Sequence, residues 1–148
     1  MPEGIAYQNK DILMKILSRN YPKTSFRAYG LDLPPVKAML PTDLPDIKAN
    51  ELRTDGVFLL EDGSLLIVDY ESTASREQLL KYGHYAFRVL ERHWQTEKQL
   101  PDINIAVIYT GEVESAPASL HRGGLRIDVR QVFLNKFDGD AIIRDAEE

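Results

Sequence analysis

The stretch that decides the fold is LRTDGVFLLEDGSLLIVDYES, residues Leu52–Ser72. It contains two apolar runs around the turn-forming pair Asp62-Gly63, a pattern that predicts a β-hairpin. Three acids, Asp55, Asp69 and Glu71, lie inside this otherwise apolar hairpin. Burying an ionised carboxylate without a partner is costly, so each acid needs a hydrogen bond, a cation or a metal.

The position of the acids depends on the turn. Strand side chains alternate between faces, so Asp69 and Glu71 share one face. A two-residue loop would divide the acids between the faces, whereas a three-residue loop, Glu61-Asp62-Gly63, would place Asp55 directly opposite Asp69. A left-handed glycine in third place suits the longer loop, with the two β-carbons about 5 Å apart. This register also predicts two further pairs: Val57 with Ile67, and Leu59 with Leu65.

The rest of the chain predicts an α/β fold. The expected elements outside the hairpin are a helix over 10–19, a proline-rich excursion over 22–50 with one short helix near 36–40, a helix over 75–98, a buried strand over 103–110 and a loop over 111–118. One or two late strands follow, and the alternation over 124–134 predicts a half-exposed strand there. A strand, a helix and a second strand in succession favour parallel pairing in a mixed sheet. The excursion is either an ordinary surface connection or a substrate-facing lid.

The long helix over 75–98 has a recognisable start and an expected buried side. Ser75 and Gln78 have the spacing of a capping box. The predicted apolar side is Leu79, Gly83, Phe87, Leu90 and Trp94. Its aromatic residues could stack nucleic-acid bases, but on a helix packed against a sheet they are expected in the core; they are Tyr82, Tyr85, Phe87 and Trp94.

Composition sets outer limits on function. The chain has 148 residues, 43% of them hydrophobic, which is enough for one domain with a core. It has no cysteine, no apolar run long enough to span a membrane and no signal-peptide pattern at its start, so a cytoplasmic protein without a membrane partner is expected. The net charge of −5 argues against broad non-specific binding to nucleic acid. The sequence leaves a homodimer open.

The clustered acids suggest a particular kind of ligand. Hard oxygen donors, with no cysteine available, suit Mg²⁺ or Mn²⁺ better than zinc. Such an ion can activate water and neutralise a phosphate oxygen. The alternative is that the acids face water or pair with an arginine such as Arg53, and the spacing alone does not decide between these two interpretations.

A family resemblance bears on this choice. An aspartate at the start of one strand, a turn, and acid–x–residue at the end of the next strand resemble the PD-(D/E)XK nuclease superfamily. RTDGVFLLEDGSLLIVDYES is similar to its recombination-promoting nuclease and transposase-associated branch, as are NKDILMKIL, LLKYGHYAFRV and IAVIYTGE. The similarity covers most of residues 9–112. It implies a restriction-endonuclease-like αβββαβ core, with a mixed sheet flanked by helices. We therefore expect one nuclease-like domain over 1–148, which can be the N-terminal part of a longer protein.

The resemblance also implies roles for individual residues. Asp55 matches the metal-binding aspartate and Asp69 the second acid, while Glu71 stands where the family has lysine, or glutamine in this branch. Glu71 cannot supply the lysine's positive charge, but it could bind metal or accept a proton. Lys81 on the following helix could supply the charge instead, or it could be an ordinary exposed helix lysine. Asp11 is a weaker candidate acid.

The implied function is a Mg²⁺- or Mn²⁺-dependent endonuclease, a hydrolase acting on DNA and linked to mobile elements or defence. The departure at Glu71 puts turnover in doubt. Two alternatives therefore stand beside the enzyme: a catalytically silent nuclease-fold module for binding or assembly, and a sheet-based oligomerisation domain whose acids are structural.

Overall fold

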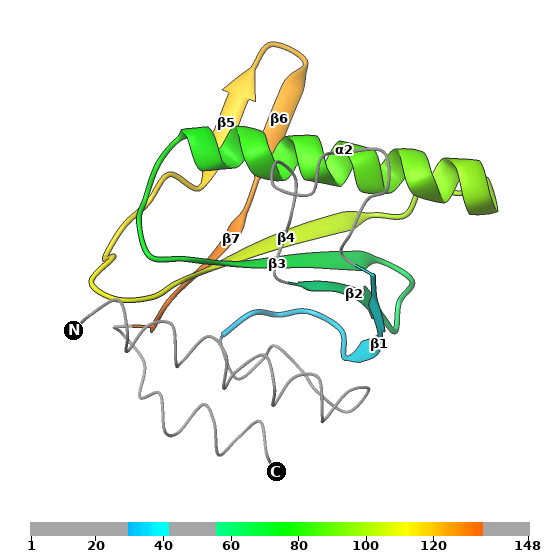
Figure 1. The fold of residues 1–148 in the computed structure, drawn as a ribbon, viewed down its shortest axis with the longest axis horizontal. Helices are drawn as coiled ribbons and strands as arrows, with labels where there is room; N and C mark the ends of the chain where they lie inside the picture. The colour runs from blue at the N-terminus through cyan, green and yellow to red at the C-terminus, as the bar shows by residue number, and fades with distance from the viewer. Residues whose placement is uncertain (1–29, 42–55, 135–148) are drawn as a thin grey trace.

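A computed structural model describes residues 30–41 and 56–134, and within these ranges the fold is mixed α/β. The elements are β1 (Val36–Leu40), β2 (Gly56–Leu60), β3 (Leu65–Glu71), α2 (Glu77–Glu97), β4 (Ile103–Tyr109), β5 (Ser119–Arg122), β6 (Leu125–Asp128) and β7 (Arg130–Phe133). Five strands form one sheet in the order β1-β2-β3-β4-β7, and β5 and β6 form a separate hairpin. The helix α2 lies across one face of the sheet (Figure 1).

Strand β3 is central in this arrangement. It pairs antiparallel with β2 and parallel with β4, and α2 connects β3 to β4. Six of its seven residues are buried, because both of its edges are hydrogen-bonded and both of its faces are covered. The expected mixed sheet with a parallel pair is confirmed.

The three-residue turn is also confirmed. The Leu60 amide donates to the Ser64 carbonyl, 2.9 Å away, and Gly63 adopts a φ of +89°. Val57 pairs with Ile67 and Leu59 with Leu65. Asp62 accepts hydrogen bonds from the amide and hydroxyl of Ser64, which lower the pKa of its carboxyl. The turn therefore sets the predicted register across the hairpin.

The segment over 36–40 is a strand, so the predicted short helix is wrong. Val36–Leu40 pairs antiparallel along β2, and the Glu61 amide donates to the Pro35 carbonyl. A five-residue helix is marginal by itself, whereas the edge of β2 offers a row of backbone partners. Tertiary pairing therefore overrides the local pattern.

The sequence allows one or two late strands, and the run over 124–134, predicted as a half-exposed strand, contains two. β6 pairs with β5, while β7 pairs parallel with β4 in the main sheet. Between them the Val129 amide donates to the Ala118 carbonyl, outside both ladders. Leu125 is exposed at the hairpin end. Continuous alternation cannot show that a chain changes partners in mid-run. The loop over 111–118 is confirmed.

The buried side of α2 differs from the predicted one. The buried residues are Leu79, Tyr82, Tyr85 and Val89, whereas Phe87 and Trp94 are exposed. The helix is thus rotated by roughly one residue step, about 100°, from the predicted orientation. Buried tyrosines are tolerated where their hydroxyls find partners. The core interpretation is right for Tyr82 and Tyr85 and wrong for Phe87 and Trp94.

Gly83 marks where the β5–β6 hairpin contacts α2. A β-carbon at this position would collide with the side chain of Ile127 on β6. The absence of a side chain allows the hairpin to lie against the first half of α2 and to project past it (Figure 1). No helix within 30–41 and 56–134 is long and apolar enough to cross a membrane.

Candidate functional site

Asp69 and Glu71 lie together at the carboxyl end of β3, on the face that α2 covers. Alternation places them on the same side as Leu65 and Ile67, which pack beneath the helix. Carboxyl ends of parallel strands are where α/β sheets commonly bind ligands. Asp69 is only 4% exposed, so its charge needs a partner within the protein.

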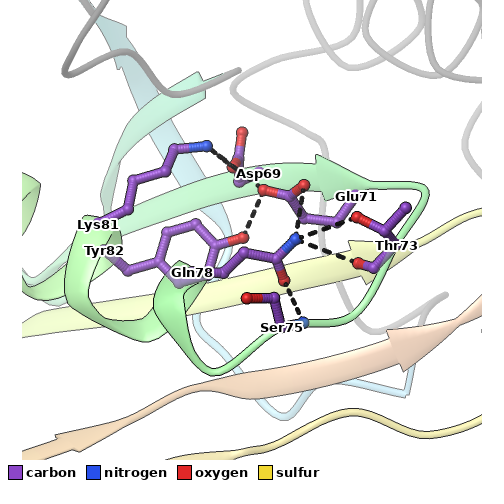
Figure 2. Close-up of polar contacts among 7 residues, drawn as sticks. All are labelled: Asp69, Glu71, Thr73, Ser75, Gln78, Lys81 and Tyr82. Atoms are coloured by element: carbon purple, nitrogen blue, oxygen red, sulfur yellow. Dashed lines mark hydrogen bonds and ion pairs between the residues drawn. The ribbon is translucent and has the colours of Figure 1, made fainter.

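Lys81, in the second turn of α2, provides that partner. Its Nζ donates to Asp69 Oδ2 at 2.9 Å and to Glu71 Oε1 at 3.3 Å (Figure 2). The Lys81 side chain remains 39% exposed, so one ammonium joins two carboxylates at the margin of the core. The interpretation of Lys81 as an ordinary exposed helix lysine does not hold.

The electrostatics keep Lys81 protonated. Partial burial favours the neutral amine, but the charges of Asp69 and then Glu71, together with their hydrogen bonds, outweigh this effect and raise the pKa of Lys81 above its ordinary value. Lys81 therefore acts as a fixed positive charge at neutral pH. It is poorly suited to accept a proton.

Two further helix side chains hold Glu71. The Tyr82 hydroxyl donates to Glu71 Oε1 at 2.7 Å, and Gln78 Nε2 lies 3.2 Å from Glu71 Oε2. Burial and the bond to Glu71 raise the pKa of Tyr82, so its hydroxyl stays a neutral donor. Glu71 thus has partners on both carboxylate oxygens (Figure 2).

Gln78 links this network to the start of the helix. Its side-chain oxygen accepts from the Ser75 amide at 3.3 Å, and its nitrogen donates to the Thr73 carbonyl at 3.2 Å. Ser75 Oγ accepts from the Glu77 amide rather than from that of Gln78, and the N-cap residue Arg76 has no side-chain capping bond, so the predicted capping box is present only in the bond from the Ser75 amide to Gln78. The Gln78 side chain therefore joins the first turn of the helix, the β3–α2 loop and Glu71.

Tyr109 forms the neighbouring wall on β4. It is the strand partner of Glu71 and stacks on Phe133 with ring centroids 5.0 Å apart. Burial raises the pKa of Tyr109, a hydrogen bond with Gln131 opposes the shift, and the Glu71 charge adds to it. The acids are therefore bordered by neutral aromatic residues.

The two acids are candidate ligands for a metal ion. Asp69 and Glu71 each place an oxygen within 3.3 Å of one ammonium nitrogen, so this spot already accommodates a cation between two hard donors. Among the residues described, no group of three or more His, Cys, Asp or Glu side chains could hold a metal. The donor chemistry fits Mg²⁺ or Mn²⁺, and a third protein ligand would have to come from elsewhere in the chain.

The structure brings together only some of the predicted site residues. Asp69, Glu71 and Lys81 come together, whereas Asp55, Asp11 and Arg53 lie outside the described residues. The predicted convergence of three acids is thus observed for two. Sequence reasoning placed Gln78 at the helix cap and Tyr82 in the core but did not connect either with Glu71. The available signal was the position of Gln78, which lies three residues before Lys81 and four before Tyr82, because residues three and four apart share a helix side.

Comparisons with protein-family models, with curated proteins and with solved structures find no match for this chain.

Proposed function

We propose that this protein is a metal-dependent phosphodiesterase acting on DNA, with a restriction-endonuclease-like core. One observation carries the proposal: two carboxylates at the carboxyl end of the central strand share a lysine from the helix that follows. The element order supports it, since β1, β2 and β3 form an antiparallel meander followed by α2 and the parallel β4. This is the order of the αβββαβ core from its first strand onward.

In this proposal Asp69 and Glu71 hold the ion, with Asp55 as the expected third ligand. A bound Mg²⁺ or Mn²⁺ would supply Lewis acidity and lower the pKa of a bound water. Tyr82 and Gln78 hold the Glu71 carboxylate in one orientation. Such preorganisation avoids paying for side-chain ordering when ligand binds.

Lys81 takes the part of the lysine that Glu71 replaces. Its raised pKa keeps it positive, so it can attract the phosphate and stabilise negative charge that develops there. It cannot act as a general base at neutral pH. An aspartate or glutamate oxygen is the better proton acceptor in the network.

A second function is favoured because the charged groups of this network already have partners within the protein. Glu71 already bonds to Lys81, Tyr82 and Gln78, and Lys81 already offsets the Asp69 charge. A network satisfied in this way needs no ion for stability. A catalytically silent module that binds or assembles is therefore the competing candidate.

Metal titration and plasmid relaxation test the proposal together. We expect calorimetry to detect Mn²⁺ binding that Asp69→Ala removes. Glu114→Ala serves as the matched control, because Glu114 is an exposed loop acid. Lys81→Met should bind Mn²⁺ at least as tightly, since a competing ammonium is removed, yet lose on the order of 100-fold in nicking rate.

The outcomes separate the two candidates. Mn²⁺-dependent nicking that disappears with EDTA and in Asp69→Ala supports the phosphodiesterase. Mn²⁺ binding without nicking, or no difference between Asp69→Ala and Glu114→Ala, rejects it and favours the silent module. Circular dichroism of each variant shows whether the fold is kept.

A further inference from the structure

The outer side of α2 carries three large exposed apolar side chains. Leu80, Phe87 and Trp94 are 56%, 63% and 50% exposed. They recur every seven residues, so they form a line along one side of the helix. The buried side of α2, with Tyr82 and Val89, points nearly the opposite way, toward the sheet. We call Leu80, Phe87 and Trp94 the outer stripe.

A histidine and three charged residues flank the members of the outer stripe. Glu77, His84, Glu91 and Lys98 alternate with Leu80, Phe87 and Trp94 at steps of three and four residues. This spacing keeps both sets on the same side of the helix. Isolated exposed apolar residues are ordinary on protein surfaces, but a continuous apolar line with polar flanks is typical of interaction sites.

The pattern is complementary to itself in one orientation. Suppose that two copies of α2 cross antiparallel on a two-fold axis at Phe87. Leu80 and Trp94 are each seven residues from Phe87, so Leu80 then meets the partner's Trp94. His84 lies three residues before Phe87 and Glu91 four after it, so His84 faces the partner's Glu91.

The ends of α2 carry mixed charges. Glu77 comes near the partner's Lys98, but the position directly opposite Glu77 is Glu97, and the position opposite the C-cap Lys98 is the N-cap Arg76. The contact between His84 and the partner's Glu91 therefore carries the antiparallel register. Each favourable contact occurs twice in a two-fold dimer. A parallel arrangement would bring Glu77 to the partner's Glu77 and Glu91 to the partner's Glu91, which repel. Charge complementarity therefore selects a second, antiparallel copy.

We propose that the outer stripe of α2 is the interface of a two-fold homodimer. Within one chain, Glu91 Oε1 lies 3.6 Å from Arg88 Nη1, and Lys98 Nζ lies 5.7 Å from the centre of the Trp94 ring. These exposed contacts are weak and can rearrange at an interface. The proposal uses no residue of the Asp69–Glu71–Lys81 network, so it stands or falls apart from the proposed enzyme activity.

Sedimentation velocity on the full chain tests the interface. We expect the wild-type protein to be a dimer at about 100 µM. Phe87→Glu places two acids on the two-fold axis and should weaken the dimer on the order of 100-fold. Leu100→Glu is the matched control: Leu100 is 66% exposed but lies beyond the helix, so the dimer should persist.

A charge exchange tests the antiparallel register. His84→Glu should weaken the dimer, because it faces the partner's Glu91, and adding Glu91→Lys should restore it. A parallel pair would gain nothing from this combination. A wild-type monomer at about 100 µM, or a dimer that Phe87→Glu leaves intact, overturns the proposal. Failure of the charge rescue overturns the antiparallel arrangement.

Discussion

The two faces of β3 bury different chemistry. Leu66, Val68 and Tyr70 point into the cluster on the side of the sheet away from α2. On the α2 side, Leu65 and Ile67 are followed by Asp69 and Glu71. The same strand therefore has one face of apolar packing and one that changes from apolar to ionic within two residues.

The two faces differ in how much disturbance of side-chain geometry they tolerate. Apolar burial is roughly proportional to the area removed from water and needs little orientation. The ionic end is stable only while Lys81, Tyr82 and Gln78 keep their geometry, because a buried carboxylate that loses its partner is costly. Replacing a buried ion pair with apolar residues is often neutral or stabilising. Stability alone gives no reason for acids at this point in the strand, which supports a functional role for them.

The largest effect is expected on the apolar face. Leu66 is fully buried at the centre of the sheet, so Leu66→Ala removes packed atoms and leaves a cavity. We predict a loss of about 3 kcal/mol in the free energy of unfolding, measured by urea denaturation. A loss below about 1 kcal/mol would mean that the surrounding side chains collapse into the space. The apolar face would then be less tightly packed than its complete burial indicates.

Asp69→Asn tests the ionic face and gives a smaller loss. If the acids lay close together without a cation between them, this change would relieve repulsion and raise the melting temperature in EDTA. The Lys81 ion pair reverses the expectation. We predict that Asp69→Asn lowers stability by about 1.5 kcal/mol, because Lys81 is half exposed and can recover water. A higher melting temperature in EDTA would show that repulsion between acids exceeds the ion pair.

The pH dependence of this loss has a definite sign. The folded-state pKa of Lys81 is raised above its ordinary value of 10.5, so the ion pair contributes fully below that pH. Its contribution declines as pH rises through the folded-state pKa. The gap between wild type and Asp69→Asn should therefore be equal at about pH 7 and pH 9 and narrow above pH 10.5.

The comparison also shows what the sequence could predict. The position of Gly63 after Glu61-Asp62 predicts the hairpin register, because turn geometry is local. Strand alternation, which is also local, predicts that Asp69 and Glu71 share one face. The βαβ connection gave the parallel pairing of β3 with β4. These features need only a few neighbouring residues.

The failures involve long-range choices. Val36–Leu40 is a strand because β2 offers an edge, and 124–134 divides because its two halves have different partners. The apolar pattern predicts the wrong side of α2 because it includes Phe87 and Trp94 and leaves out the tyrosines, whereas Tyr82 is buried with its hydroxyl bonded to Glu71. The sequence places Lys81 on the helix after β3, near enough to reach the acids. No local pattern specifies that its side chain turns toward β3.

The smallest effect is expected at Tyr82, which belongs to both kinds of packing. Its ring lies in the apolar cluster under α2, while its hydroxyl donates to Glu71 Oε1. Tyr82→Phe keeps the ring and removes the hydrogen bond from one of the three side chains that bond to Glu71. We therefore predict a loss of about 1 kcal/mol in the free energy of unfolding.

A double-mutant cycle with Glu71→Ala isolates the cause of this loss. If the hydroxyl acts through Glu71, Tyr82→Phe should cost almost nothing in the Glu71→Ala background, since its acceptor is already gone. An equal loss in both backgrounds would place the role of Tyr82 in the apolar packing alone, and the ionic network would then rest on Lys81 and Gln78.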